Sequence, residues 1–208
     1  MKTIVITLII FFTMVQINAQ KTRSAEEAKG LEAGTVAPDF RAVDASGNEF
    51  HLASALKEGP VVLIFYRGHW CPVCNKHLAV IQDSLQLITD KGATVVAVSP
   101  QKPEYLDKMA DKTGASFSLL YDEGYAIADA YDVTFTPEKK ELIIYNTVLN
   151  AQLKKSQSDD SQRLPIPATY IIDRDGLIAW RQFDPDYKNR SNVKNILEAL
   201  ELTGEMKE

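Results

Sequence analysis

The most informative stretch of this chain is an apolar run that leads into a pair of cysteines. Residues 61–65 read Val-Val-Leu-Ile-Phe, and the only two cysteines of the sequence, Cys71 and Cys74, follow closely. Such a run is typical of a buried strand, and the stretch at 75–89 favours a helix. The first thiol is then expected at a helix N-terminus, where free backbone N–H groups and the helix dipole stabilise a thiolate. This placement indicates a thiol redox centre.

The start of the chain has the pattern of a secretory signal peptide. A basic residue precedes an apolar stretch at 4–15, and Ala19 offers a small residue for cleavage. The stretch is shorter than the roughly 20 residues that cross a bilayer, which disfavours an uncleaved membrane anchor. We therefore predict a signal peptide at 1–19, a leader segment at 20–33 and one domain at 34–208. The mature protein is expected to be exported, most simply to a bacterial periplasm, with no membrane span.

Charge and cysteine content exclude several classes of protein. With 23 basic and 28 acidic residues, the formal net charge is −5. This balance gives no electrostatic basis for nucleic acid or an anionic membrane as a partner. A disulfide between cysteines separated by two residues closes too small a ring to restrain the unfolded chain much. The pair is therefore either catalytic or part of a metal site.

Strand and helix patterns alternate along the rest of the chain. A hairpin is predicted at 39–43 and 49–52, because alternating residues flank a Ser-Gly-Asn turn. The remaining predictions are strands at 61–66, 93–99 and 117–121, helices at 103–112, 125–131 and 138–153, a surface loop at 154–163, a hairpin of 169–173 with 177–183, and a closing helix at 191–202 capped by Ser191. This order predicts an α/β three-layer sandwich, in which helices flank a mixed central sheet and the N-terminal hairpin is an extension.

Four segments carry a resemblance to a known family. They read GTVAPDF at 34–40, FYRGHWCPVC at 65–74, LPIPATYIID at 164–173 and DYKNR at 186–190. In combination they resemble the alkyl hydroperoxide reductase/thiol-specific antioxidant (AhpC/TSA) family, in particular its peroxiredoxin-like members, over roughly residues 34–202. The resemblance implies a thioredoxin-like fold and a thiol-dependent oxidoreductase.

The resemblance is incomplete around the cysteines. Members of the family typically have a proline seven residues before the reactive cysteine and a threonine or serine three before it, where this chain has Ile64 and Gly68. They also place an arginine at the start of the late strand that faces the thiolate, and here Pro167 occupies that place. Arg67 offers a partial substitute for the missing charge. These departures favour thiol–disulfide exchange with a protein over reduction of a hydroperoxide.

The chemistry assigns different roles to the two cysteines. Because only a thiolate attacks a disulfide or a peroxide, Cys71 at the helix N-terminus is the expected nucleophile. Pro72 suits the first helical position, where no N–H is needed. Cys74, one turn on, is the expected resolving thiol, which closes the internal disulfide. That redox-active disulfide is the only cofactor that the chemistry requires.

Several neighbouring residues have two interpretations each. Trp70 either shields the disulfide or is an ordinary core aromatic, and His77 is either a proton shuttle for Cys74 or a solvated helix histidine. The resemblance implies a cis bond between Ile166 and Pro167, with the backbone there presented to a substrate. For Tyr187, surface packing is the favoured interpretation.

Two further classes of function stay open. Two thiolates with the imidazole of His69 or His77 are ligands that suit a soft cation, so a copper-binding module on the same fold is an alternative. A third alternative is a redox-inert binding domain that retains the Cys71–Cys74 motif without using it. As a redox protein, the chain is expected to work with a thiol/disulfide protein or a thioredoxin-like reductant, and a hydroperoxide is the alternative substrate.

Overall fold

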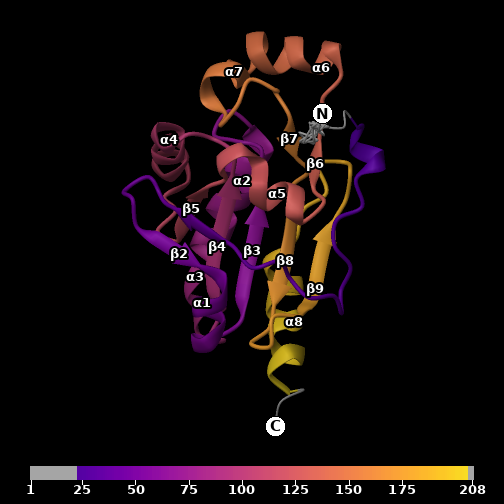
Figure 1. Ribbon diagram of the computed structural model, residues 1–208. Helices are drawn as coiled ribbons and strands as arrows, with labels where there is room; N and C mark the ends of the chain where they lie inside the picture. The colour runs from indigo at the N-terminus through magenta and orange to yellow at the C-terminus, as the bar shows by residue number, and fades with distance from the viewer. Residues whose placement is uncertain (1–22, 206–208) are drawn as a thin grey trace, which may run out of the picture.

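The computed structural model describes residues 23–205, so the predicted signal peptide lies outside the described residues (Figure 1). At its centre is a mixed sheet in the order β5-β4-β3-β8-β9. These strands are β3 (Val61–Phe65), β4 (Thr94–Ser99), β5 (Ser118–Tyr121), β8 (Ala168–Ile172) and β9 (Ile178–Phe183). The strands β3, β4 and β5 are parallel, whereas β8 and β9 run antiparallel to their neighbours. The predicted α/β sandwich with a mixed central sheet is confirmed.

Side chains of β3 alternate between two cores, one on each face of the sheet. Val62 and Ile64 pack into a core shared with one set of helices, and Leu63 and Phe65 pack into the other. On the first face lie α2 (Pro72–Asp83), α3 (Leu85–Thr89), α4 (Pro103–Thr113) and α8 (Val193–Glu205), and on the second lie α1 (Leu52–Glu58) and α5 (Ala126–Ala130). Each fully buried aliphatic side chain contributes about 1.5–3 kcal/mol through the hydrophobic effect. This double burial explains why the strand is an unbroken apolar run.

The N-terminal hairpin pairs β1 (Arg41–Val43) with β2 (Glu49–His51) in antiparallel register, as predicted. The Asp44 carboxylate closes its turn by accepting the backbone N–H groups of Ser46 and Asn48, each at 2.9 Å. Helix α1 follows the hairpin directly and was not anticipated by the sequence patterns, since only two of its side chains, Leu52 and Leu56, are buried.

The predicted helix 138–153 is broken into pieces. They are α6 (Lys139–Ile143), the π-helical turn η3 (Ile144–Val148) and α7 (Leu153–Ser156). Between them Asn150 and Gln152 adopt left-handed backbone with φ of 49° and 46°, which ends the helix. The buried Leu153 then starts α7, which extends into the predicted surface loop 154–163. Both predictions are therefore wrong at this junction.

Short elements complete the fold. They are η1 (Ala25–Glu27), η2 (Glu123–Tyr125), and a two-stranded pair of β6 (Thr134–Phe135) with β7 (Leu164–Pro165). The described part of the leader segment packs along the domain, because Arg23 pairs with Asp132 and the Leu31 N–H donates to the Tyr170 hydroxyl at 3.2 Å.

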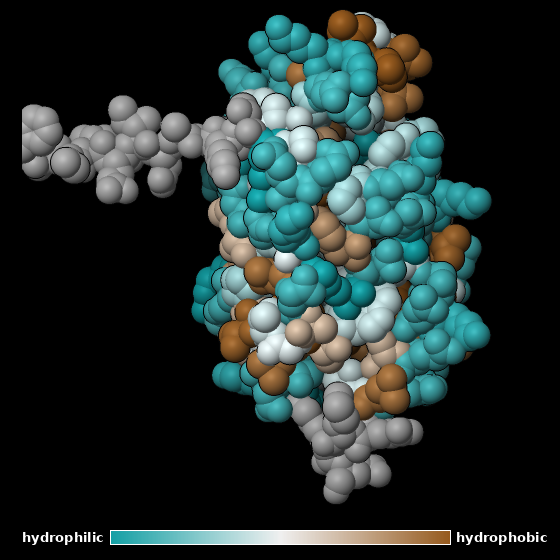
Figure 2. Space-filling model, turned by 90° about the vertical axis from the view of Figure 1, so that its right-hand side faces the viewer, coloured by the Kyte–Doolittle hydropathy of each residue, from teal (hydrophilic) through white to brown (hydrophobic). Residues whose placement is uncertain are grey.

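The face drawn in Figure 2 is mostly hydrophilic, with apolar atoms in several places. Figure 2 shows brown atoms at the end of the molecule where Figure 1 places α6. Ile143, Ile144 and Val148, on α6 and η3, are the exposed apolar residues there. Within residues 23–205, no helix has both the length and the apolar character needed to cross a bilayer.

Candidate active site

The two cysteines lie where β3 turns into α2. Cys71 is the N-cap of the helix, and its sulfur accepts the backbone N–H of Cys74 at 3.3 Å. Pro72 occupies the first helical turn, where a missing N–H costs nothing. The strand-to-helix placement of the dithiol that the sequence predicts is therefore what the structure has.

The two thiols are in contact and closed off from solvent. The sulfur atoms of Cys71 and Cys74 lie 2.6 Å apart. Both residues are 0% exposed and belong to the same core cluster as Trp70 and Ile166. The two sulfurs are therefore in position to react with each other, and a partner too large to enter the site does not reach either of them in this conformation.

A buried arginine lies against the first sulfur. Arg67 is only 2% exposed, and its Nη2 donates to the sulfur of Cys71 at 3.2 Å. The guanidinium is enclosed by aromatic rings, with its Cζ 3.8 Å from the ring centre of Tyr187 and 5.2 Å from those of Trp70 and Tyr145. Its Nη1 also donates to the hydroxyl of Tyr145 at 3.1 Å. Tyr187 therefore packs on the active-site arginine, and its interpretation as surface packing is wrong.

A second arginine approaches the second sulfur. Nη2 of Arg190 lies 3.6 Å from the sulfur of Cys74, and its Nε donates to the carbonyl of Tyr187 at 2.5 Å. Arg190 and Tyr187 both come from the loop between β9 and α8, more than a hundred residues after the cysteines. The DYKNR segment marks this loop in the sequence, but nothing in it indicates contact with the thiols.

One of the two thiols ionises readily, and the other does not. Burial opposes ionisation of Cys74, but the hydrogen bond between the two sulfurs and the charges of Arg190 and Arg67 lower the pKa of Cys74 well below its ordinary range. The hydrogen bond to Cys74, burial and the charge of that neighbour raise the pKa of Cys71, while Arg67 acts against them. Two sulfurs in contact share one proton, so we assign the lowered pKa to the first ionisation of the pair. Geometry favours Cys71 as the acceptor, because the Cys74 amide and Arg67 both donate to it.

His77 is buried rather than solvated. It is 8% exposed, and its Nε2 bonds the hydroxyl of Ser191 at 3.1 Å, which in turn bonds Thr169 at 2.8 Å. Burial and the nearby charge of Arg190 lower the pKa of His77 to about 4, so the imidazole is neutral at neutral pH. Ser191 is consequently not the cap of α8, and the side chain of Asn192 accepts a helix N–H instead.

The predicted cis bond between Ile166 and Pro167 is wrong, because no peptide bond within residues 23–205 is cis. The N–H of Ile166 donates to the carbonyl of Val133 at 2.6 Å, which holds the chain extended as it passes from β7 into β8. The trans form of an X–Pro bond is also favoured by about 0.5–1 kcal/mol. Ile166 itself is buried in the core cluster that contains both cysteines.

Histidines do not complete a metal site with the cysteines. The ring of His69 bonds Gln101 at 3.2 Å, and the ring of His51 bonds Asp39 at 2.8 Å. In the part of the chain that the structure describes, no three histidine, cysteine or acidic side chains gather where a metal ion could be held.

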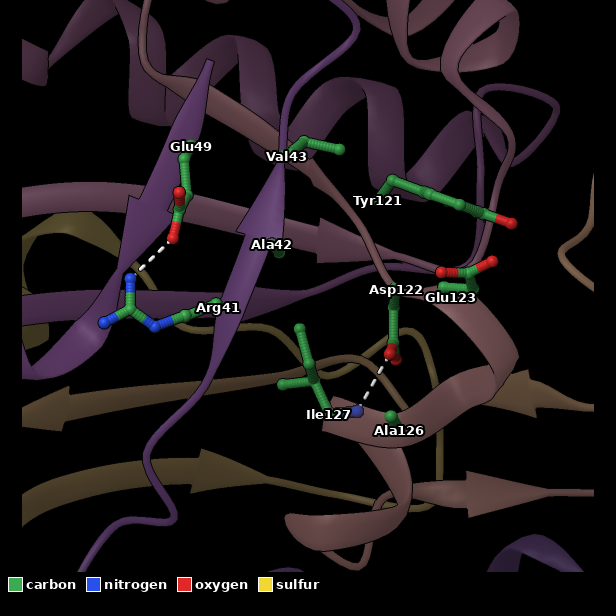
Figure 3. A pocket seen from close by; sticks show the side chains of 9 residues that line it. All are labelled: Arg41, Ala42, Val43, Glu49, Tyr121, Asp122, Glu123, Ala126 and Ile127. Carbon is green, nitrogen blue, oxygen red and sulfur yellow. Dashed lines mark hydrogen bonds and ion pairs between the residues drawn. The ribbon is translucent and has the colours of Figure 1, made fainter. Parts of the chain in front are cut away.

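A separate hollow of about 380 Å³ lies between the N-terminal hairpin and α5 (Figure 3). Arg41 pairs with Glu49 on one side at 2.6 Å. On the other side the Asp122 carboxylate accepts the N–H groups of Ile127 and Ala128 at 2.8 and 2.9 Å. Burial raises the pKa of Asp122 to about 6. The cysteines do not line this hollow, so it is separate from the redox site.

The fold and the dithiol at a helix N-terminus define a thiol-based oxidoreductase of the thioredoxin superfamily. The model of the AhpC/TSA family matches residues 33–181. The chain therefore belongs to the AhpC/TSA family, and its peroxiredoxin-like character is confirmed.

The individual relatives are named either as peroxiredoxins or as thiol-disulfide oxidoreductases. A Mycobacterium tuberculosis protein whose name places it among the peroxiredoxins is 30% identical over 154 residues, covering 74% of this chain and 86% of its own. The thiol-disulfide oxidoreductase ResA of Geobacillus kaustophilus is 21% identical over 175 residues, covering 84% and 81%. The crystal structure of peroxidoxin BcpB from Mycobacterium tuberculosis has a TM-score of 0.64 at 21% identity, covering 83% and 97%, and shows the shared fold.

Proposed function

We propose that the chain is a thiol-dependent peroxidase that reduces small hydroperoxides, with Cys71 as nucleophile and Cys74 as resolving thiol. One observation carries this proposal: both sulfurs are closed off from solvent, with Arg67 donating to Cys71 beneath aromatic rings. A small peroxide needs less opening to enter such a site than a protein disulfide does. The geometry thus favours the substrate that the sequence departures made the second choice.

The first half of the cycle oxidises the dithiol. The thiolate of Cys71 attacks the terminal oxygen of ROOH, the O–O bond breaks, and Cys71 becomes a sulfenic acid while RO⁻ leaves. The alkoxide takes the proton of Cys74, which gives ROH and leaves Cys74 as a thiolate. That thiolate attacks the sulfur of the sulfenic acid, hydroxide leaves and is protonated to water, and the disulfide forms. Arg67 and Arg190 stabilise the negative charge on each sulfur in turn.

The second half returns the disulfide to the dithiol. Two electrons must come from an external thiol, and we propose a thioredoxin-like protein as the reductant. Trp70 and Pro72 hold the cysteine loop in position. The disulfide itself is the only cofactor in this cycle.

Rapid mixing of the reduced protein with hydrogen peroxide tests the peroxidase function. We expect a second-order rate constant at least about a hundredfold above that of a free thiol at neutral pH, because the pair ionises readily and the arginines stabilise the charge that develops in the transition state. A Cys71→Ser variant should lose the reaction, and a Cys74→Ser variant should keep the first step. A rate no faster than a free thiol would refute the proposal.

Thiol–disulfide exchange with a protein substrate is the second candidate. The Cys-Pro-Val-Cys sequence at a helix N-terminus favours it, as does the presence of Gly68 and Pro167 where peroxidases of the family have activating groups. In the Cys74→Ser variant, disulfide-linked complexes with extracellular proteins that form faster than peroxide is consumed would favour this candidate.

We further propose export to the periplasm, with a signal peptide at 1–19, a leader at 20–33 and the catalytic domain at 34–208. Intact-mass analysis of protein recovered from a periplasmic extract should give a chain that starts at Gln20. Elemental analysis of the same material, purified without chelators, addresses the copper alternative, which requires a stoichiometric metal.

A further inference from the structure

A groove of about 520 Å³ runs beside the dithiol, between α2 and the loop that precedes α8. Its apolar lining comes from Pro72, Val73 and the exposed Val80. Pro72 and Val73 are the two residues between the cysteines, so the groove reaches the redox loop itself. This volume is within the range of about 300–1,000 Å³ that accommodates ligands and side chains of a partner.

All charged side chains that line the groove are positive. Lys76, Lys188 and Arg190 line it, and no aspartate or glutamate does. Among the described residues, neither lysine is in ion-pair contact with a carboxylate. The nearest acidic residue on the same loop, Asp186, accepts the backbone N–H of Lys188 at 3.0 Å. The chain as a whole has a net charge of −5, whereas the groove is positively charged. The groove therefore attracts an acidic ligand.

Two polar side chains of the groove lie near Cys74 in space or in sequence, the half-buried Arg190 and the buried His77. Arg190 lines the groove and also lies 3.6 Å from the sulfur of Cys74. His77 lines it too, is 8% exposed, and its Nδ1 has no hydrogen-bond partner among the described residues. A ligand in the groove is therefore placed on the Cys74 side of the dithiol, next to polar atoms that lack partners.

We infer that this groove receives the reductant of the Cys71–Cys74 disulfide, and that it selects a protein thiol flanked by acidic and apolar side chains. The inference rests on the proposed redox cycle. The partner's thiolate attacks the sulfur of Cys74, the Cys71–Cys74 bond breaks, and Cys71 leaves as a thiolate beside Arg67. A second thiol of the partner then attacks its own sulfur in the mixed disulfide, which releases Cys74 as a thiolate beside Arg190. The partner is oxidised by two electrons to a disulfide.

Matched peptide thiols test the charge selection. The probes are three short peptides in which a cysteine and a leucine are flanked by glutamate, glutamine or lysine. The protein is first oxidised with diamide, so no reaction with peroxide is needed, and the loss of two hydrogens is checked by mass. Alkylation and mass analysis then follow the reduction of the disulfide by each peptide. Each rate is divided by the rate of the same peptide with hydroxyethyl disulfide, which removes differences in thiol reactivity.

We expect the glutamate peptide to react at least about threefold faster than the glutamine peptide, and the lysine peptide to be slowest, at low ionic strength. The preference should disappear in a Lys76→Gln/Lys188→Gln variant and persist in Lys57→Gln/Lys139→Gln, which also removes two positive charges but from residues that do not line the groove. Equal normalised rates for the three peptides, or a preference that survives the double variant, would overturn the inference. A protein that never forms the internal disulfide would instead refute the redox cycle on which it rests.

Discussion

Replacing Arg67 with methionine removes the positive charge that faces the first sulfur. Nη2 of Arg67 lies 3.2 Å from the sulfur of Cys71, and the side chain is 2% exposed. Methionine is unbranched and makes favourable contacts with aromatic rings, so it fills the space between the rings of Trp70 and Tyr187. The perturbation is therefore chiefly electrostatic.

The size of the effect follows from the distance. Two unit charges about 4 Å apart interact by about 4 kcal/mol at an effective dielectric of about 20. Because one pKa unit corresponds to about 1.4 kcal/mol, the upper limit is a rise of about 3 in the pKa of the first thiol ionisation. Arg190 and the N–H of Cys74 remain in the variant, so we expect a rise of about 2. Losing a cation raises a thiol pKa, and the thiolate fraction at neutral pH falls accordingly.

The assay is the pH dependence of iodoacetamide alkylation of the reduced protein, read by mass. The midpoint in Arg67→Met should move to higher pH by about 2. Arg67→Lys keeps the charge and should titrate close to wild type. Arg163→Met is a matched control, because Arg163 is also buried and stacked on a tyrosine, Tyr125, but pairs with Asp129 rather than a thiol. A wild-type midpoint in Arg67→Met would refute the electrostatic role of this arginine.

Three further predictions concern the resolving thiol, the aromatic enclosure and a buried carboxyl. In Cys74→Ser, hydrogen peroxide should leave a sulfenic acid on Cys71 that dimedone traps, whereas wild type should give only the internal disulfide. In Tyr187→Leu, the ring 3.8 Å from the Arg67 guanidinium is lost, which should cost about 0.5–2 kcal/mol and slow the peroxide reaction up to about thirtyfold without moving the melting temperature by more than a few degrees. In wild type the pKa of Asp122 is raised from 3.8 to about 6, so the folded state binds the extra proton between these pH values and stability falls as pH rises through them. Relative to Asp122→Asn, wild type should lose about 2–3 kcal/mol of unfolding free energy from pH 4 to 7, measured by urea titration, and parallel pH profiles would contradict this.

Local patterns in the sequence were sufficient for the centre of the fold. The apolar run at 61–65 is buried on both faces, so its composition alone identifies a central strand. The N-cap position of Cys71 follows from its place directly before Pro72, a residue that suits the first helical turn. The hairpin around Asp44 depends on a turn whose hydrogen bonds stay within five residues. In each case the determining contacts are close in sequence.

The surroundings of the thiols were not predictable in the same way. Tyr145 lies on a π-helical turn inside a segment whose spacing matches an ordinary helix, and its contact with Arg67 joins residues 78 positions apart. Arg190 reaches Cys74 across 116 positions. The cis-proline expectation failed because it depended on an analogy, while the backbone bond of Ile166 to Val133 decides the path of the chain. Such contacts exist only once the sheet has brought distant loops together.

The departures from the family pattern have a structural reason at one position. Gly68 has φ of 150°, a conformation that disfavours any side chain. A Cβ there would also lie 2.6 Å from Cδ of Gln101 and 2.7 Å from Nε1 of Trp70. The space that a threonine or serine would need is thus filled by the Gln101 amide, whose Oε1 accepts the N–H of His69 at 2.7 Å. The loop therefore has no room for the missing hydroxyl, and positive charge at the sulfurs comes from Arg67 and Arg190.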